Sequence, residues 1–146
     1  MNTEKEREIE SIRYTVGNEL NLEAVLDLYK ASTLGESRPI EDRERFAAML
    51  RHANLLITAW DGELLVGISR TLTDFHYIAY LADLAVRRSH QKRGIGKELI
   101  RRTQTEGGPK TNIVLLAAPA AEGYYSHIGF QSVPQAWFLK AGATVV

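Results

Sequence analysis

Two segments in the first half of the chain carry apolar residues at helical spacing. Residues at i, i+3, i+4 and i+7 lie on one side of a helix, so this spacing predicts a helix with one buried stripe. The spacing occurs at Leu22, Val25, Leu26 and Tyr29, and again at Phe46, Met49, Leu50 and Ala53. The segment between them, residues 32–39, is polar and contains glycine and proline, which indicates a loop.

Strands are predicted where apolar residues are frequent or alternate with polar ones. These segments are residues 12–16, 55–60, 64–73 and about 76–86. Asp61 and Gly62 separate the second segment from the third, and glycine accepts the positive φ that tight turns require. The second and third segments are therefore predicted to form a hairpin.

The second half of the chain continues this alternation of helices and strands. A helix is predicted from about residue 94 to 106, followed by Gly107, Gly108 and Pro109, which end it. The apolar run at 112–118 is typical of a buried strand, a second helix is expected to start near Pro119, and short strands are expected at 130–139. This order predicts an α/β (mixed α+β) protein with a single domain over residues 1–146, of which residues 1–10 form a flexible tail.

Composition limits the classes of function. The chain has 146 residues, 45% of them apolar, and its formal net charge is zero. One domain with a sizeable core is expected, and the neutral charge disfavours nucleic acid or a membrane as partner. The chain has no cysteine, which excludes disulfides and a thiol nucleophile. With no secretory signal or membrane-spanning stretch in the sequence, we expect a cytoplasmic protein.

An apolar strand runs directly into a basic turn that contains two glycines. Gly94 and Gly96 carry no Cβ, so the backbone between Gln91 and Lys97 allows a bulky anion to come close. The N–H groups at the start of the following helix point outward, which favours an anion there. Cationic side chains surround the turn, at Arg87, Arg88, Lys92, Arg93 and Lys97. The segment therefore predicts a phosphate site.

Two common nucleotide-binding motifs do not fit this turn. A dinucleotide fingerprint needs a third small residue three positions after Gly96, where this chain has Leu99. A P-loop needs a glycine at position 91 and Ser or Thr at position 98, where this chain has Gln91 and Glu98.

The motif that fits is Q-x-x-G-x-G at residues 91–96, after a strand that ends in Leu-Ala-Val. It resembles the first signature of the GNAT superfamily of N-acetyltransferases. Residues 120–130, which contain Tyr124 and Tyr125 and end in Gly129 and Phe130, resemble the second signature of that family, a helix that ends in aromatic-Tyr-x-x-x-Gly-Phe. The strand predicted at 112–118 lies between the two motifs, as in the family.

This resemblance implies a fold, a cosubstrate and a set of contacts. The fold is a central, mostly antiparallel mixed sheet flanked by helices, and the cosubstrate is acetyl-CoA, with no metal. In the family, the turn grips the pyrophosphate, the preceding strand pairs with the pantetheine arm, and a backbone N–H of that strand stabilises the oxyanion. The residues implied to bind the coenzyme are Leu84, Ala85, Val86, Gln91, Lys92, Arg93, Gly94, Ile95, Gly96 and Lys97.

Thioester aminolysis needs an acid and a base. The resemblance implies that Tyr125 is the general acid, since a phenol with pKa ~10 can protonate a departing thiolate with pKa ~8.5. The alternative is that Tyr124 and Tyr125 are an aromatic pair buried for packing. An amine with pKa ~10.4 must lose a proton before attack, and Asp83 is a candidate base. The alternative for Asp83 is a structural carboxylate, bonded to neighbouring N–H groups or paired with Arg87.

Weaker candidates for the base are Tyr80, His76 and His127, and His90 is interpreted as a loop residue. Without cysteine, direct attack in a ternary complex is favoured over an acyl-enzyme, although a Ser or Tyr nucleophile stays open. In the family, the acceptor lies over the first two helices, their loop and the central strands. Residues there are Glu36, Arg38, Asp42, Trp60, Phe75, Tyr77 and Tyr80.

One departure from the family pattern concerns the acceptor side. Many members carry an asparagine near the end of the strand before the second motif, where this chain has the small apolar residues 117–120. The main hypothesis is N-acetylation of a small-molecule amine. The alternatives are acetylation of a protein N-terminus or lysine, an acyl-CoA-binding or sensing module without transfer activity, and nucleic-acid binding through the basic turn. A homodimer is a mild expectation from the family.

Overall fold

The computed structural model describes Glu4 and residues 11–146. The rest of the flexible tail expected at residues 1–10 lies outside the described residues. The chain divides into two compact units, residues 1–116 and residues 117–146.

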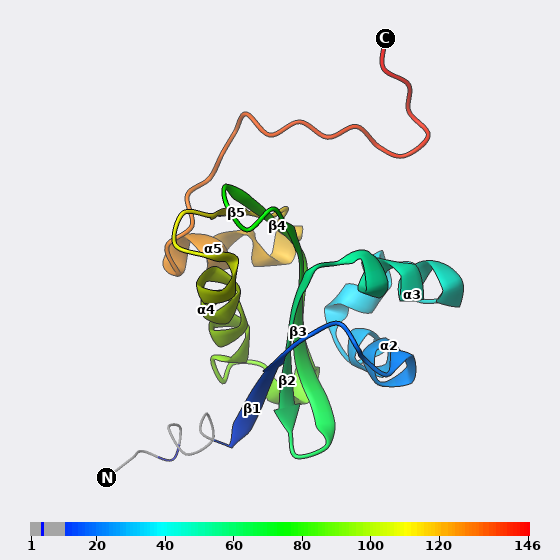
Figure 1. The fold of residues 1–146 in the computed structure, drawn as a ribbon, viewed down its shortest axis with the longest axis vertical. Helices are drawn as coiled ribbons and strands as arrows, with labels where there is room; N and C mark the ends of the chain where they lie inside the picture. Colours follow the sequence, from blue (N-terminus) through cyan, green and yellow to red (C-terminus); the bar gives the residue numbers. More distant parts are fainter. Residues whose placement is uncertain (1–3, 5–10) are drawn as a thin grey trace. The chain divides into compact units, whose positions relative to one another are not determined.

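The first unit is built on a five-stranded sheet in the order β1-β2-β3-β4-β5 (Figure 1). Its strands are β1 (Ile12–Val16), β2 (Leu55–Asp61), β3 (Leu64–Thr73), β4 (Ile78–Val86) and β5 (Asn112–Val114). Strands β1 to β4 pair antiparallel to one another in that order, and β5 pairs parallel with β4. The predicted mixed α/β sheet flanked by helices is confirmed, as is the hairpin at Gly62, whose φ is 58°.

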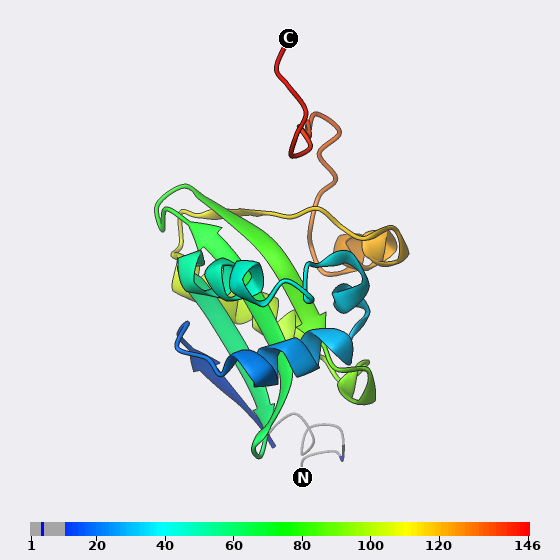
Figure 2. The ribbon, with the colours of Figure 1, turned by 90° about the vertical axis from the view of Figure 1, so that its right-hand side faces the viewer.

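Three helices cover the two faces of this sheet (Figure 2). They are α2 (Leu22–Lys30), α3 (Arg43–His52) and α4 (Ile95–Gly107). The apolar stripes of α2 and α3 share one buried cluster with Leu56 and Ile68 of the sheet, whereas Ile95 and Leu99 of α4 belong to a second cluster with Val66. The helices therefore form because amphipathic spacing buries one side of each against the sheet.

The loop predicted at residues 32–39 is partly helical. A short 3-10 helix, η1 (Thr33–Ser37), follows α2. Ser32 supports both elements, because its Oγ accepts a hydrogen bond from the Leu34 N–H (3.2 Å) and donates one to the Tyr29 carbonyl (3.0 Å). Polar residues that bond the backbone locally favour such short turns.

The buried strand predicted at 112–118 is wrong in length and burial. Strand β5 ends at Val114, and the side chain of Leu116 is exposed. The reason is pairing, since β5 meets β4 only from Ile78 to Tyr80. Beyond that point the apolar run has left the sheet.

The second unit contains a short 3-10 helix, η3 (Pro119–Ala121), and a short helix, α5 (Glu122–His127). The helix expected near Pro119 is therefore confirmed. The strands expected at residues 130–139 are wrong, because no residue of that segment is in a strand. A strand needs a neighbour for its backbone groups, and the bond from the Ala136 N–H to the Val133 carbonyl is that of a local turn.

Gly35 in η1 provides a test of this packing. A Cβ at this position would lie 2.6 Å from the Tyr29 carbonyl oxygen, so the backbone of η1 or α2 must shift. We expect Gly35→Ala to lower the free energy of unfolding by about 1–3 kcal/mol, measured in urea. The control is Gly107→Ala, whose Cβ would make only ordinary contacts of 3.9 Å or more. Equal stability of the two variants would contradict the expectation.

Candidate functional site

Strand β4 has an edge that β5 covers only in part. The register between the two strands ends where Tyr80 faces Val114, whereas β4 continues to Val86. Within the described residues, the last six residues of β4 therefore have no strand beside them on that edge. An unpaired strand edge offers backbone N–H and C=O groups to an extended ligand.

The hydrogen bonds around the end of β4 show which residues face this edge. The Arg87 N–H donates to the Val66 carbonyl of β3 (2.8 Å), so alternate residues before Arg87 direct their backbone groups toward β3. Leu84 and Val86 then direct theirs to the uncovered edge. Ala85 faces β3, and its side chain is buried in the core.

Gln91 begins the turn that joins β4 to α4. Its Nε2 donates to the Val86 carbonyl at 3.0 Å, which fastens the turn to the strand. Lys92 and Gly94 then adopt φ values of 64° and 82°. These left-handed residues reverse the chain, and Gly94 is the N-cap of α4.

The start of α4 is open to an anion. Gly94 carries no side chain to cap the helix, so the N–H groups of Ile95, Gly96 and Lys97 have no partner within the helix. The helix dipole adds positive potential there. In the described part of the chain, none of Lys92, Arg93 and Lys97 forms an ion pair. The predicted phosphate turn thus has the geometry of an anion site.

The arginines before the turn have protein partners. Arg87 pairs with Asp27 at 2.8 Å and also donates to the Leu65 carbonyl, with only 13% of its side chain exposed. Arg88 lies 3.6 Å from Glu36. The cations left for a ligand are those inside the turn.

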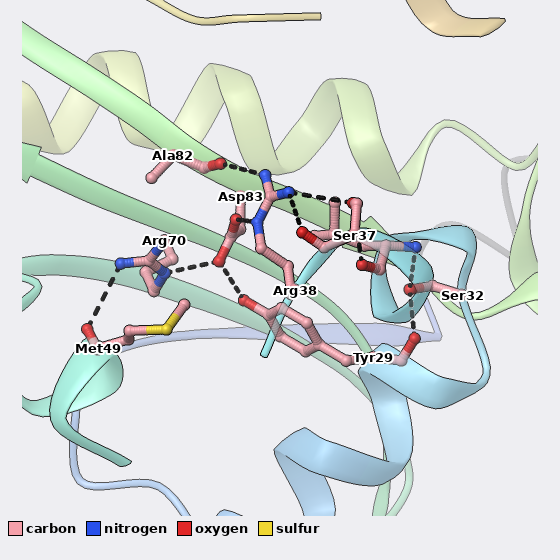
Figure 3. Close-up of polar contacts among 9 residues, drawn as sticks. Tyr29, Ser32, Ser37, Arg38, Met49, Arg70, Ala82 and Asp83 are labelled. Atoms are coloured by element: carbon pink, nitrogen blue, oxygen red, sulfur yellow. Dashed lines mark hydrogen bonds and ion pairs between the residues drawn. The ribbon is translucent and has the colours of Figure 1, made fainter. Parts of the chain in front are cut away.

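A buried charged cluster lies on the face of the sheet that α2 and α3 cover (Figure 3). We call it the Asp83 cluster, and it consists of Tyr29, Arg38, Arg70 and Asp83. The Tyr29 hydroxyl donates to Asp83 Oδ2 at 2.7 Å, Arg70 Nε donates to Oδ2 at 2.6 Å, and Arg38 Nε donates to Oδ1 at 2.6 Å. Asp83 itself is 1% exposed.

Arg38 links this cluster to the loop after η1 and to the backbone of β4. Its Nη2 donates to the Ala82 carbonyl at 3.1 Å, and its Nη1 donates to the carbonyl and the hydroxyl of Ser37 (Figure 3). Ala82 is the extra residue where the register between β3 and β4 shifts. Arg38 therefore holds the loop against an irregular point of the strand.

The cluster keeps Asp83 ionised. Burial would raise its pKa, but the hydrogen bonds and charges of Arg70, Tyr29 and Arg38 outweigh burial and hold the pKa below its ordinary value. The pKa of Tyr29 is raised well above 10 by burial and by the neighbouring Asp83 charge. A carboxylate with both oxygens bonded and a lowered pKa is a poor proton acceptor.

This geometry favours the structural alternative for Asp83 over the role of base. The pairing of Asp83 with Arg87 that was considered from the sequence is wrong, because Arg87 pairs with Asp27. The partners are Arg38 and Arg70. Arg70 was the residue that sequence reasoning missed, and the signal was present, since a charged residue inside an apolar strand needs a buried partner.

The expected acceptor residues divide by role. Tyr80 faces Leu72 across the β3–β4 ladder, and Leu72 lies two residues from Arg70, so both project from the face of the Asp83 cluster. Both are about 40% exposed. Tyr80 and Leu72 thus lie exposed on the face of the sheet that carries the Asp83 cluster. Asp42 instead caps α3, since its Oδ1 accepts from the Arg45 N–H.

The remaining acceptor candidates lie elsewhere in the fold. Trp60 donates to Thr58 Oγ1 on β2, and Glu36 faces Arg88. Phe75 and Tyr77 lie in the β3–β4 turn, where the Asp74 carboxylate accepts from the N–H groups of residues 76–78. These bonds lower the pKa of Asp74 to about 2.

The weaker candidates for the base are scattered. His76 Nδ1 lies 2.9 Å from the Asp74 carbonyl oxygen in the exposed β3–β4 turn, and Tyr80 is on the accessible surface. His127 is exposed in α5 of the second unit.

Tyr125 lies in α5 of the second unit. Its ring meets Tyr124 and Phe130 edge to face, with centroids 5.4 Å apart in each pair. Burial and the neighbouring Tyr124 raise the pKa of Tyr125, so its hydroxyl is protonated at neutral pH. The residue has the protonation state of an acid, and its catalytic role stays a prediction.

The described residues also bear on two other kinds of site. No helix there is long and apolar enough to cross a membrane. No group of three or more His, Cys, Asp or Glu side chains there is arranged to hold a metal ion.

Comparison with known proteins supplies the family. A model described as an acetyltransferase (GNAT) domain matches residues 29–146. A comparison with curated proteins found no match. Among solved structures, a GNAT family acetyltransferase from Streptococcus pneumoniae TIGR4 aligns with a TM-score of 0.67 at 24% identity, covering 88% of this chain and 98% of that one.

Two aminoglycoside acetyltransferases share the fold as well. AAC(6')-Iy, solved in complex with CoA, aligns with a TM-score of 0.68 at 18% identity, over 90% of this chain and 95% of that one. An enzyme from an uncultured soil metagenomic sample, in complex with sisomicin, aligns with a TM-score of 0.65 at 22% identity, over 90% and 99%.

Replacing Asp83 tests the cluster. In Asp83→Asn, Arg38 and Arg70 keep their charges and lose the carboxylate, and breaking a buried ion pair from one side costs about 3–5 kcal/mol. We expect that loss in the free energy of unfolding, measured in urea. The control is Asp27→Asn, whose carboxylate pairs with Arg87 at the surface and is worth about 1 kcal/mol or less. Similar losses in both variants would contradict the central role of Asp83.

The lowered pKa of Asp83 also predicts how the stability difference between wild type and Asp83→Asn depends on pH. Because the folded pKa of Asp83 lies below the unfolded value of about 3.9, its stabilisation is complete above that value and is lost as the pH falls through the folded pKa. The stability difference between wild type and Asp83→Asn should therefore be constant from about pH 5 to 7 and shrink below about pH 4. A difference that grows on acidification would exclude this linkage.

Proposed function

The chain belongs to the GNAT acetyltransferase family, and we propose that it transfers the acetyl group of acetyl-CoA to the amine of a small molecule. The observation that carries the proposal is the continuity of one segment, in which the uncovered edge of β4 leads directly into the anion site at the start of α4. A ligand with an extended polar arm and a pyrophosphate at its end matches that order of groups.

The donor half of the site uses mainly backbone groups. Leu84 and Val86 offer edge N–H groups to the amides of the pantetheine arm. The N–H groups of Ile95, Gly96 and Lys97 receive the pyrophosphate, and the unpaired cations of the turn add to the attraction. Gln91 supports this site indirectly, because its side chain is bonded to the Val86 carbonyl.

The reaction follows from the charges that develop. The amine nitrogen attacks the thioester carbon, and a backbone N–H of the β4 edge donates to the carbonyl oxygen as that oxygen gains negative charge. The carbon–sulfur bond then breaks, and the Tyr125 hydroxyl gives its proton to the thiolate. Attack is direct, within a ternary complex.

The Asp83 cluster prepares the acceptor side. It contains two guanidinium groups and one carboxylate, so it carries an excess positive charge beside the surface of Tyr80 and Leu72. A nearby positive charge lowers the pKa of an ammonium group and favours the neutral amine. In this proposal Asp83 holds Arg38 in place, and a water molecule accepts the proton of the amine.

Both units contribute to the proposed enzyme. The family model spans residues 29–146 and so covers most of the first unit and all of the second, which supports one catalytic domain. Some solved relatives bind aminoglycosides, which supports a small molecule as acceptor. A cytoplasmic location and a homodimer stay predictions, and light scattering tests the latter.

The experiment that tests the proposal measures thiol release. Purified protein is incubated with acetyl-CoA and a panel of small amines, and free CoA is followed with a thiol reagent. The assay has no protein background, because the chain contains no cysteine. Tight CoA binding without thiol release on any amine would favour the acyl-CoA sensor instead.

Gly94 tests the donor site. We expect Gly94→Ala to raise the dissociation constant of CoA about tenfold, because a methyl group then projects where the pyrophosphate approaches. The matched control is Gly62→Ala in the β2–β3 hairpin. Both glycines have positive φ and open space where a Cβ would lie, so both variants should lose about 1–2 kcal/mol of stability. Calorimetric titration with CoA should distinguish the two variants. Equal CoA affinities would refute the assignment of the turn as the pyrophosphate site.

Tyr125 tests the acid. Loss of general acid catalysis costs about 10²–10⁴-fold, so Tyr125→Phe should lower kcat by that order and leave the dissociation constant of CoA nearly unchanged. Tyr124→Phe is the control, since it removes a hydroxyl from the neighbouring ring and should keep most of the activity. A full-rate Tyr125→Phe enzyme would exclude the role.

A further inference from the structure

His90 is a buried titratable residue that the proposed reaction does not use. It lies in a short 3-10 helix, η2 (Arg88–His90), directly before the turn that starts at Gln91. Only 8% of the residue is exposed. The sequence indicated a loop residue there, and His90 does lie in the connection between β4 and α4, but its side chain is buried rather than exposed.

Both ring nitrogens of His90 have partners. Nε2 lies 2.8 Å from Asp61 Oδ2, and Nδ1 lies 2.7 Å from Ser89 Oγ. With two hydrogen bonds the ring has one orientation, and neither nitrogen is free to bind a ligand directly. Any effect of His90 on the coenzyme must therefore act through the position of the turn.

Asp61 is far from His90 in the sequence and belongs to another part of the sheet. It is the last residue of β2, at the β2–β3 hairpin, 29 residues before His90. The hydrogen bond thus ties the beginning of the phosphate turn to the end of a strand in the sheet. That strand is held on both sides, by β1 and by β3.

The turn needs such support because its backbone is strained. Lys92 has φ 64°, and a left-handed conformation is unfavourable for a residue with a side chain. Strained segments persist where the surrounding structure fixes both ends. The far end is fixed by Ile95, which is buried in the α4 core cluster, and the near end by His90.

We propose that His90 is a positioning residue for the pyrophosphate end of the coenzyme, with Asp61 as its anchor. This inference rests on the proposed function. The pair holds the start of the turn so that the N–H groups beyond Gly94 point at the phosphates before the coenzyme arrives. Preorganisation of this kind reduces the ordering cost of binding.

The test compares CoA with pantetheine, which lacks the pyrophosphate together with the 3′-phosphorylated adenosine that it carries. CoA carries the pyrophosphate, whereas pantetheine lacks it and keeps the arm that follows the β4 edge. We expect His90→Gln to weaken CoA binding about tenfold in calorimetric titration and to leave pantetheine binding unchanged. In turnover, KM should rise for acetyl-CoA but not for acetyl-pantetheine, with kcat little changed for both donors.

Asp61→Asn is the conservative companion, because an amide oxygen still accepts a hydrogen bond from the ring. We expect a smaller loss of CoA affinity in this variant, and the double variant should be no worse than His90→Gln alone. Asp27→Asn, which removes the partner of the neighbouring Arg87, is the control and should bind both ligands like wild type.

Each other result overturns the inference. A variant that loses both ligands equally shows a general structural role, and one that loses neither shows that the turn holds itself. Wild-type protein that binds CoA no better than pantetheine has no pyrophosphate site, which removes the proposed function together with the inference. If wild type binds CoA better than pantetheine and His90→Gln binds both ligands like wild type, the inference fails and the proposed function stands.

Discussion

The carboxylate of Asp83 is the contact on which the functional half of the fold depends. It receives hydrogen bonds from α2 through Tyr29, from the loop after η1 through Arg38, and from β3 through Arg70. All three bonds converge on β4. Because the charge is buried, removing one partner leaves an uncompensated ion in a medium that solvates it poorly. Helix α2, the loop after η1 and strand β3 are thereby held in one arrangement against β4.

Strand β4 serves several purposes at once because each of its sides faces different surroundings. One edge pairs with β3, and the other is left open by the short β5. The face that carries Asp83 also carries Tyr80, on the acceptor side of the proposed reaction. The end of the strand passes into the turn, which Gln91 and His90 fasten to the sheet. In the proposed enzyme, donor and acceptor would thus be positioned from a single strand.

Local patterns predict local features of this chain well. The helical stripes around Val25 and Phe46, the hairpin at Gly62 and the glycine turn at Gly94 follow from spacing and from backbone freedom. The partners of Asp83 do not, because Arg38 and Arg70 are 45 and 13 residues away and no short-range pattern joins them. The prediction of strands at residues 130–139 failed for a related reason. Trp137 and its neighbours have strand propensity, but strand formation depends on a partner strand. Pairing is a property of the tertiary fold.

A buried ionic cluster is a costly way to stabilise a protein, since apolar residues of similar volume often do as well or better. What the cluster provides here is a defined orientation of its side chains. An apolar side chain at position 38 would pack against the sheet in several ways, whereas the guanidinium of Arg38 meets Asp83, the Ala82 carbonyl and Ser37 together only in one. That arrangement fixes the loop after η1 at the bulge in β4, immediately before the residues that face the uncovered edge of the strand. The cluster therefore contributes specificity of geometry, which the proposed function requires between the sites for coenzyme and amine.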